Sequence, residues 1–188
     1  MCIRDRYLSN VNNGKGLMLG GVAGVTPTEV VIIGAGTVGE CAARAAIGLG
    51  ASVKVFDNSL SKLRRIQSDM NARVYTSIIQ PKVLSNALRR ADVVISALRS
   101  NDKRTPCVVS DEMVQAMKNG SVIVDVSIDQ GGCVETSEVT NHANPVFTKH
   151  GVVHYCVPNI PSRVSRTATF ALSNLLTPTI LRIADEGG

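Results

Sequence analysis

The chain has 188 residues, 44% of them hydrophobic and only 3% aromatic, which suits one α/β domain with a core of small aliphatic side chains. The formal net charge is +5, but no aromatic residues are interleaved among the basic ones, which argues against a nucleic-acid partner. No apolar run reaches the roughly 18 residues that a membrane span requires. Five cysteines without a C-x-x-C pair favour a reducing, cytoplasmic compartment over a disulfide framework.

The chain begins with residues 1–6 (MCIRDR), which fit nothing that follows. We expect them to be a non-native leader. Residues 7–13 are consistent with the end of a helix, which Asn13 and Gly14 close. A glycine-rich stretch then leads into the first strand.

The strongest motif is VVIIGAGTVG at residues 30–39. Its four apolar residues predict a buried parallel strand, and a Gly-x-Gly-x-x-Gly turn follows at Gly34, Gly36 and Gly39. Asp57 stands at the end of the second predicted strand, 23 positions after Gly34. This arrangement, with an acid about 20 residues beyond the turn, is typical of dinucleotide binding. The alternative is a tight turn that needs its glycines for shape alone.

Each part of this motif has a physical reason. Gly34 allows the tight turn, Gly36 lets the backbone approach a pyrophosphate, and Gly39 lets the helix pack on the sheet. The following helix presents free N–H groups and the positive end of its dipole to the phosphates. Asp57 can accept hydrogen bonds from the ribose hydroxyls of the adenosine.

The rest of the chain alternates between strands and helices. Further strands are predicted at residues 52–56, 73–76, 92–98, 121–126 and 152–157. Helices are predicted at residues 40–50, 60–71, 81–91, 112–118 and 167–184. This alternation indicates parallel strands joined by right-handed crossovers. We therefore predict an α/β fold of Rossmann type, a doubly wound parallel sheet with helices on both faces.

Ligands of such sheets bind outside the carboxyl ends of the strands. There the fifth predicted strand is followed by SIDQGGC at residues 127–133, which places Asp129 where a nicotinamide ring would lie. An incidental acid in a Gly-Gly turn is the plainer interpretation of that stretch alone. The sixth predicted strand is followed by VPNIP at residues 157–161, whose prolines stiffen a loop facing the same crevice. The three histidines have no metal-ligand spacing, so no metal site is predicted.

Together these stretches resemble the family of alanine dehydrogenase and pyridine nucleotide transhydrogenase. The resemblance covers nearly everything from Tyr7 to Gly188. It rests on residues 20–25 (GGVAGV), 33–39, 125–133 (DVSIDQGGC) and 154–161 (HYCVPNIP). The Ile-Asp-Gln-Gly-Gly run is the specific part, and it favours the alanine dehydrogenase branch.

The resemblance implies reversible oxidative deamination of L-alanine to pyruvate and ammonia by hydride transfer to NAD. It implies Asp129 as the catalytic residue, and Asp57 disfavours NADP because a 2′-phosphate would face a carboxylate. Nearby basic residues could soften that rejection. The cofactor-binding residues that we predict are Gly34, Ala35, Gly36, Thr37, Val38, Gly39, Asp57, Asn58, Lys62, Ala97, Leu98, Arg99, Val126, Ser127, Ile128, Asp129, Val157, Pro158, Asn159 and Ile160.

The resemblance also implies a second, catalytic domain that carries the substrate-binding arginine and lysine and the acid/base histidine. We therefore expect residues 7–165 to form the nucleotide domain, and residues 166–188 to begin a helix that returns to the missing catalytic domain. The full-length protein is expected to be a homo-oligomer acting on L-alanine and pyruvate, and this chain to be inactive alone. Two alternatives stay open, the nucleotide-binding domain of a transhydrogenase and an NAD-binding module without chemistry.

Overall fold

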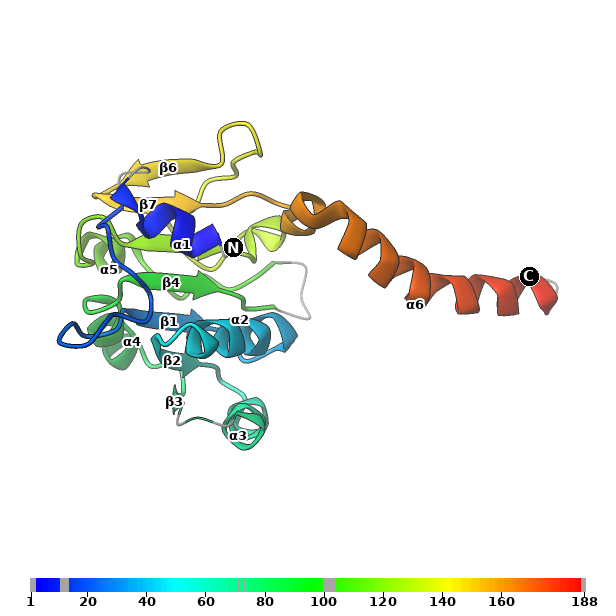
Figure 1. Cartoon of the computed structure of the whole chain (residues 1–188), viewed down its shortest axis with the longest axis horizontal. Helices are drawn as coiled ribbons and strands as arrows, with labels where there is room; N and C mark the ends of the chain where they lie inside the picture. Colours follow the sequence, from blue (N-terminus) through cyan, green and yellow to red (C-terminus); the bar gives the residue numbers. More distant parts are fainter. Residues whose placement is uncertain (1–2, 11–13, 71, 73, 100–103, 187–188) are drawn as a thin grey trace. The chain divides into compact units, whose positions relative to one another are not determined.

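The computed structural model describes residues 3–10, 14–70, 72, 74–99 and 104–186. The chain divides into two compact units, Met1–Pro158 and Asn159–Gly188. The second unit contains the short 3-10 helix η3 (Ile160–Val164) and the long helix α6 (Ser165–Asp185). Every strand among the described residues belongs to the first unit (Figure 1).

The first unit is built on one sheet, in the order β3-β2-β1-β4-β5-β7-β6 (Figure 1). Its strands are β1 (Glu29–Ile33), β2 (Ser52–Phe56), β3 (Tyr75–Ser77), β4 (Val93–Ser96), β5 (Val122–Asp125), β6 (Val146–Lys149) and β7 (Val152–Tyr155). All neighbours pair in parallel except β6 and β7. The chain winds outward from β1 to β3 and then returns to β4, so the strand order reverses between β1 and β4. That reversal is where doubly wound sheets bind ligands.

Helices cover both faces of the sheet. In the first unit they are α1 (Ile3–Leu8), α2 (Thr37–Gly48), α3 (Leu60–Asp69), α4 (Pro81–Leu88), α5 (Asp111–Gln115) and η2 (Ile128–Gln130). Val31 and Ile33 of β1 share a buried cluster with Leu84 of α4. Alternate strand residues point to opposite faces, so Ile32 faces the other way, toward Gly39 at the start of α2. Figure 1 shows α2 lying across the front of the sheet. The predicted doubly wound fold is confirmed.

Local sequence signals set several helix starts. The Ser59 hydroxyl accepts a hydrogen bond from the backbone N–H of Lys62 at 3.4 Å and caps α3. The Ser110 hydroxyl caps α5 in the same way. Pro81 occupies the first turn of α4, where its missing N–H costs nothing.

The prediction missed β6 and its antiparallel pairing with β7. The two strands are joined by His150 and Gly151, whose φ angles of 52° and 74° make a two-residue turn with both residues in the left-handed region. Such a turn matches the twist of a hairpin. Residues 146–149 therefore form an edge strand, for which the sequence analysis predicted no element.

Smaller differences concern boundaries. Helix α2 begins at Thr37, three residues before the predicted start, because the helix opens directly after Gly36 and already includes Gly39. Strand β3 runs over Tyr75–Ser77 instead of residues 73–76. The predicted ends at residues 13, 71 and 73 lie outside the described residues.

Candidate dinucleotide-binding site

The three glycines of the turn after β1 are needed for different reasons. Gly34 has φ +111°, and a Cβ there would overlap the carbonyl oxygen of Ala97. A Cβ on Gly39 would overlap the carbonyl oxygen of Gly34. A Cβ on Gly36, in contrast, would meet no atom of the described residues within 4 Å. Shape alone therefore explains Gly34 and Gly39, but it does not explain Gly36, which opens onto free space.

The N-terminus of α2 faces that free space. Gly36 is its N-cap, and the N–H of Glu40 makes a helical hydrogen bond to the Gly36 carbonyl at 2.9 Å. The N–H groups of the first helical turn have no acceptor within an α-helix. They carry the partial positive charge of the helix dipole, so this end of α2 suits an anion.

Asp57 lies against the glycine turn, as the motif predicts. The residue is buried, and its Oδ2 accepts a hydrogen bond from the N–H of Ala35 at 2.7 Å. Its Oδ1 accepts from the N–H of Ser59 at 2.7 Å. From α3, the Arg65 guanidinium donates to the Ala35 carbonyl at 3.2 Å and pairs with Glu40 at 3.3 Å. These bonds fix the turn to the end of β2, a structural role for Asp57 that the sequence did not reveal.

Two cavities lie beside the turn, and both are lined by Ala97, Leu98 and Arg99 after β4. The first, of about 220 Å³, is also lined by Gly36, Asp57, Asn58, Lys62, Ile79, Pro106 and Val108. The second, of about 260 Å³, is also lined by Val38, Val126, Ser127, Asp129 and Gln130. The two cavities thus meet at the end of β4, where the strand order reverses. An elongated ligand with two ends fits this arrangement.

Most predicted cofactor-binding residues line one of these cavities, namely Gly36, Val38, Asp57, Asn58, Lys62, Ala97, Leu98, Arg99, Val126, Ser127 and Asp129. The lining of the two cavities does not include Gly34, Ala35, Thr37, Gly39, Ile128, Val157 and Pro158. Of these, Gly34, Ala35, Gly39, Ile128 and Val157 are buried. Asn159 and Ile160 belong to the second unit. The binding roles of all these residues stay predictions.

The structure adds lining residues that the sequence analysis missed. Ile79 follows the carboxyl end of β3, so the rule that ligands bind at strand ends would have found it. Gln130 is the neighbour of Asp129. Pro106 and Val108 lie between β4 and α5, after residues 100–103, which are outside the described part of the chain.

The turn after β5 requires glycine at positions 131 and 132 for structural reasons. Gly131 and Gly132 have φ angles of 94° and 71°. A Cβ on Gly132 would lie 2.8 Å from Oδ2 of the buried Asp125. The glycines are therefore required by the turn, while Asp129 is exposed and lines the second cavity.

His154 has a structural environment. It is fully buried, its Nε2 lies 2.8 Å from the Thr136 hydroxyl, and its Nδ1 lies 2.9 Å from the Val152 carbonyl. Its ring stacks on Phe147, and burial lowers the pKa of His154.

Within the described part of the chain, no group of three or more His, Cys, Asp or Glu side chains could hold a metal ion. No helix there is long and apolar enough to span a membrane.

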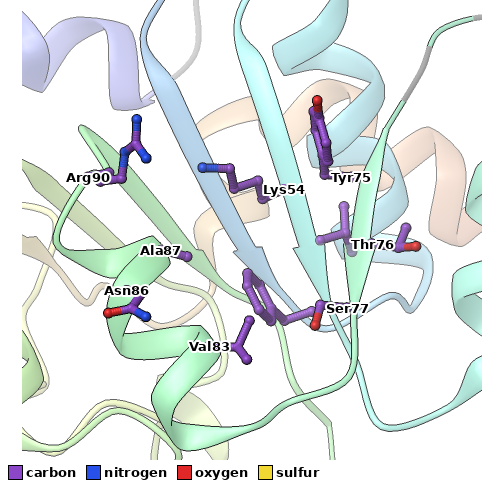
Figure 2. A pocket seen from close by; sticks show the side chains of 10 residues that line it. Lys54, Tyr75, Thr76, Ser77, Val83, Asn86, Ala87 and Arg90 are labelled. Carbon is purple, nitrogen blue, oxygen red and sulfur yellow. The ribbon is translucent and has the colours of Figure 1, made fainter.

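A further groove, of about 300 Å³, follows β2 and β3 beside α4 (Figure 2). Lys54 and Arg90 lie at one end of it, and Ser77 and Val83 lie farther along. Both cations already face Glu29, at 2.7 Å and 3.7 Å. The positive charge of Lys54 and Arg90 is therefore already paired with Glu29.

Comparison with known proteins identifies the family. Residues 3–188 match the family described as "Alanine dehydrogenase/PNT, C-terminal domain". The chain belongs to this family. The match covers both units of the structure.

The relatives of this family member include curated alanine dehydrogenases. The chain is 45% identical to that of Mycolicibacterium smegmatis over 181 residues, which is 96% of the chain and 49% of the relative. The chain is also 45% identical to the alanine dehydrogenase of Bacillus subtilis (strain 168), over 98% of the chain and 49% of the relative. The chain therefore spans about half the length of these curated relatives.

Solved structures agree with this assignment. A structure titled L-alanine dehydrogenase has a TM-score of 0.94 and 42% identity, covering 98% of this chain and 51% of that one. The transhydrogenase from Sinorhizobium meliloti has a TM-score of 0.76 and 24% identity over 94% of this chain and 53% of that one, a likeness of fold alone. Among these relatives, the alanine dehydrogenases are nearer than the transhydrogenase.

Proposed function

We propose that this family member is the NAD(H)-binding domain of an L-alanine dehydrogenase. The observation that carries the proposal is the free space at Gly36, the N-cap of α2, in a cavity that the buried Asp57 also lines. Relatives at 45% identity named alanine dehydrogenase supply the reaction. In the full-length protein, that reaction is the reversible oxidative deamination of L-alanine to pyruvate and ammonia.

The residues of the first cavity suit the adenosine half of the cofactor. The N–H groups at the start of α2 would bind the diphosphate. Both Asp57 oxygens already accept a backbone N–H, but each carboxylate oxygen has a second lone pair for a ribose hydroxyl. Lys62 lines the same cavity and adds positive charge near the phosphates.

The residues of the second cavity suit the nicotinamide half. Asp129 lines this cavity with an exposed carboxylate that can orient the nicotinamide ribose or the reacting groups. When bound, the nicotinamide would supply hydride transfer, while the protein supplies orientation and electrostatics. The substrate-binding arginine and lysine and the acid/base histidine would come from another part of the full-length protein.

We propose NAD rather than NADP as the cofactor. A 2′-phosphate would lie against the Asp57 carboxylate, which is repulsive. Of the basic residues that follow Asp57, Arg65 is already bonded to Ala35 and Glu40. Lys62 lines the same cavity as Asp57 and would lessen the repulsion without removing it. The expected homo-oligomer, the cytoplasmic location and the roles of residues 7–165 and 166–188 are part of the same proposal.

Titration calorimetry of this chain with NADH and NADPH tests the proposal. The parent chain should bind NADH more tightly than NADPH. Asp57→Ala should weaken NADH binding by about 10- to 100-fold, the loss expected for one charge-assisted hydrogen bond of about 1.5–3 kcal/mol. The affinity for NADPH should fall less, because Asp57→Ala also removes the repulsion between the carboxylate and the 2′-phosphate.

Asp69→Ala is the matched control, because Asp69 is an exposed acid at the end of α3 outside the lining of both cavities. It should leave both affinities unchanged. Unchanged affinities in Asp57→Ala would remove Asp57 from the site. A parent chain that binds neither nucleotide would refute the proposed function.

A further inference from the structure

Asp125, the last residue of β5, is fully buried, and both hydroxyl and backbone N–H groups donate hydrogen bonds to its carboxylate. Its Oδ1 accepts from the Ser96 hydroxyl at 2.9 Å and from the N–H of Ser127 at 3.0 Å. Its Oδ2 accepts from the Ser137 hydroxyl at 2.7 Å. Cys133 Sγ lies 2.7 Å from Ser96 Oγ and can donate to it. The carboxylate is thus bonded to β4, to the loop after β5 and to the segment beyond the Gly-Gly turn.

These bonds connect the two sides of the second cavity. Ser96 ends β4 and directly precedes Ala97 and Leu98, which line the cavity. Ser127 begins the segment that carries Asp129, and its hydroxyl donates to the Leu98 carbonyl at 2.8 Å. Asp125 itself is outside the cavity lining. It acts on the cavity through the groups that it holds.

The environment of Asp125 indicates a positional role. Burial raises the pKa of Asp125, whereas the hydrogen bonds from Ser137, Ser96 and the backbone oppose that rise. Removing a carboxylate from water is costly, and a well-packed apolar residue often gives equal or greater stability. The chain also keeps Gly132 without a Cβ, which leaves room for Asp125 Oδ2. The buried Asp125 carboxylate and the glycine beside it are both explained if the second cavity requires the geometry that these hydrogen bonds set.

We propose that Asp125 is a positioning residue for the nicotinamide end of the site. Its carboxylate sets the separation between Leu98 on one side and the segment from Ser127 to Asp129 on the other. This inference rests on the proposed NAD(H) function. It predicts that loss of the carboxylate damages the second cavity more than the first, because the first cavity shares only Ala97, Leu98 and Arg99 with the second.

The affinities of the chain for NADH and for ADP, both measured by calorimetry, separate the two cavities. ADP reports on the glycine turn and the first cavity, whereas NADH also needs the second. Asp125→Ala should raise the Kd for NADH about tenfold or more and leave the Kd for ADP within about twofold. Asp125→Asn should stay within about threefold of the parent for both. Its amide oxygen can still accept from Ser96 and Ser127, and its NH₂ group can donate to the Ser137 oxygen.

Two further variants keep the test decisive if Asp125→Ala does not fold. Ser96→Ala removes one donor to Asp125 from a residue that is itself 0% exposed, and it should raise the Kd for NADH about threefold or more without affecting ADP. Ser137→Ala is the matched control, because it removes the donor to Oδ2 and keeps the Ser96 and Ser127 donors to Oδ1. It should leave both Kd values within about twofold of the parent.

The outcomes distinguish this inference from the proposed function. Suppose that the parent binds NADH and ADP, and that folded Asp125→Ala keeps the parental ratio of the two Kd values. The positioning role is then wrong and the proposed function stands. Ser96→Ala gives the same test if Asp125→Ala does not fold. Equal losses for NADH and ADP indicate a general structural role and also overturn the inference. A parent chain that binds neither ligand overturns both the function and the inference.

Discussion

Gly36→Ala is the sharpest test of the site, because it separates binding from folding. The backbone at Gly36 has φ −75° and ψ −174°, values that alanine adopts without strain. The added methyl group would meet no atom of the described residues within 4 Å. Loss of glycine flexibility in the unfolded chain and the poorer N-cap quality of alanine act in opposite directions. The free energy of unfolding should therefore change by less than about 1 kcal/mol.

Binding should respond much more strongly than stability. The methyl group occupies the space where a diphosphate would approach the N–H groups of α2. Loss of one charge-assisted hydrogen bond corresponds to about 1.5–3 kcal/mol, so the Kd for NADH should rise by about 10- to 100-fold. Calorimetry gives the Kd, and urea unfolding gives the stability of the same sample.

Two other glycines of α2 serve as controls. Gly48→Ala adds a methyl group that also meets no described atom within 4 Å, but at the opposite end of the helix. It should stabilise the chain by about 0.5–1 kcal/mol and leave the Kd for NADH unchanged. Gly39→Ala should destabilise the fold, because its methyl group overlaps the Gly34 carbonyl. If Gly36→Ala binds NADH as tightly as the parent, the diphosphate does not lie over this turn.

Two predictions concern buried groups outside the site. The free energy of unfolding should fall as the pH drops below about 6.5, because burial lowers the pKa of His154 and the unfolded chain then binds a proton that the folded chain does not. The free energy of unfolding should change by at most about 1.4 kcal/mol per pH unit. Urea unfolding at several pH values measures this slope, which should be smaller in His154→Gln. Burial raises the pKa of Cys133 to about 12 and that of Cys156 to about 11, so iodoacetamide should label exposed Cys41 first in the folded chain. Peptide mapping that finds Cys133 labelled as fast as Cys41 would contradict that burial.

The sequence determined the centre of this protein, because its decisive signals are local. A buried strand, a glycine turn and a helix follow one another within residues 29–48, and each is specified by the residues that form it. Asp57 could be placed beside the turn because β1 and β2 are consecutive parallel neighbours. The rule that ligands bind at the carboxyl ends of strands then located most residues that line the two cavities. The same rule, applied to β3, would also have located Ile79.

The tertiary structure decided what depends on groups far apart in the chain. The bond from Ser96 to Asp125 joins side chains 29 residues apart, and the contact of Arg65 with Ala35 spans 30 residues. No local pattern encodes these contacts, because they form only when the strands take their places in the sheet. The hairpin of β6 and β7 is local in the sequence, but only the pairing of β7 with β5 adds it to the sheet. The local sequence therefore determined the strand, the glycine turn and the helix where we propose that a diphosphate binds. Long-range packing decided which buried groups connect the two sides of the second cavity.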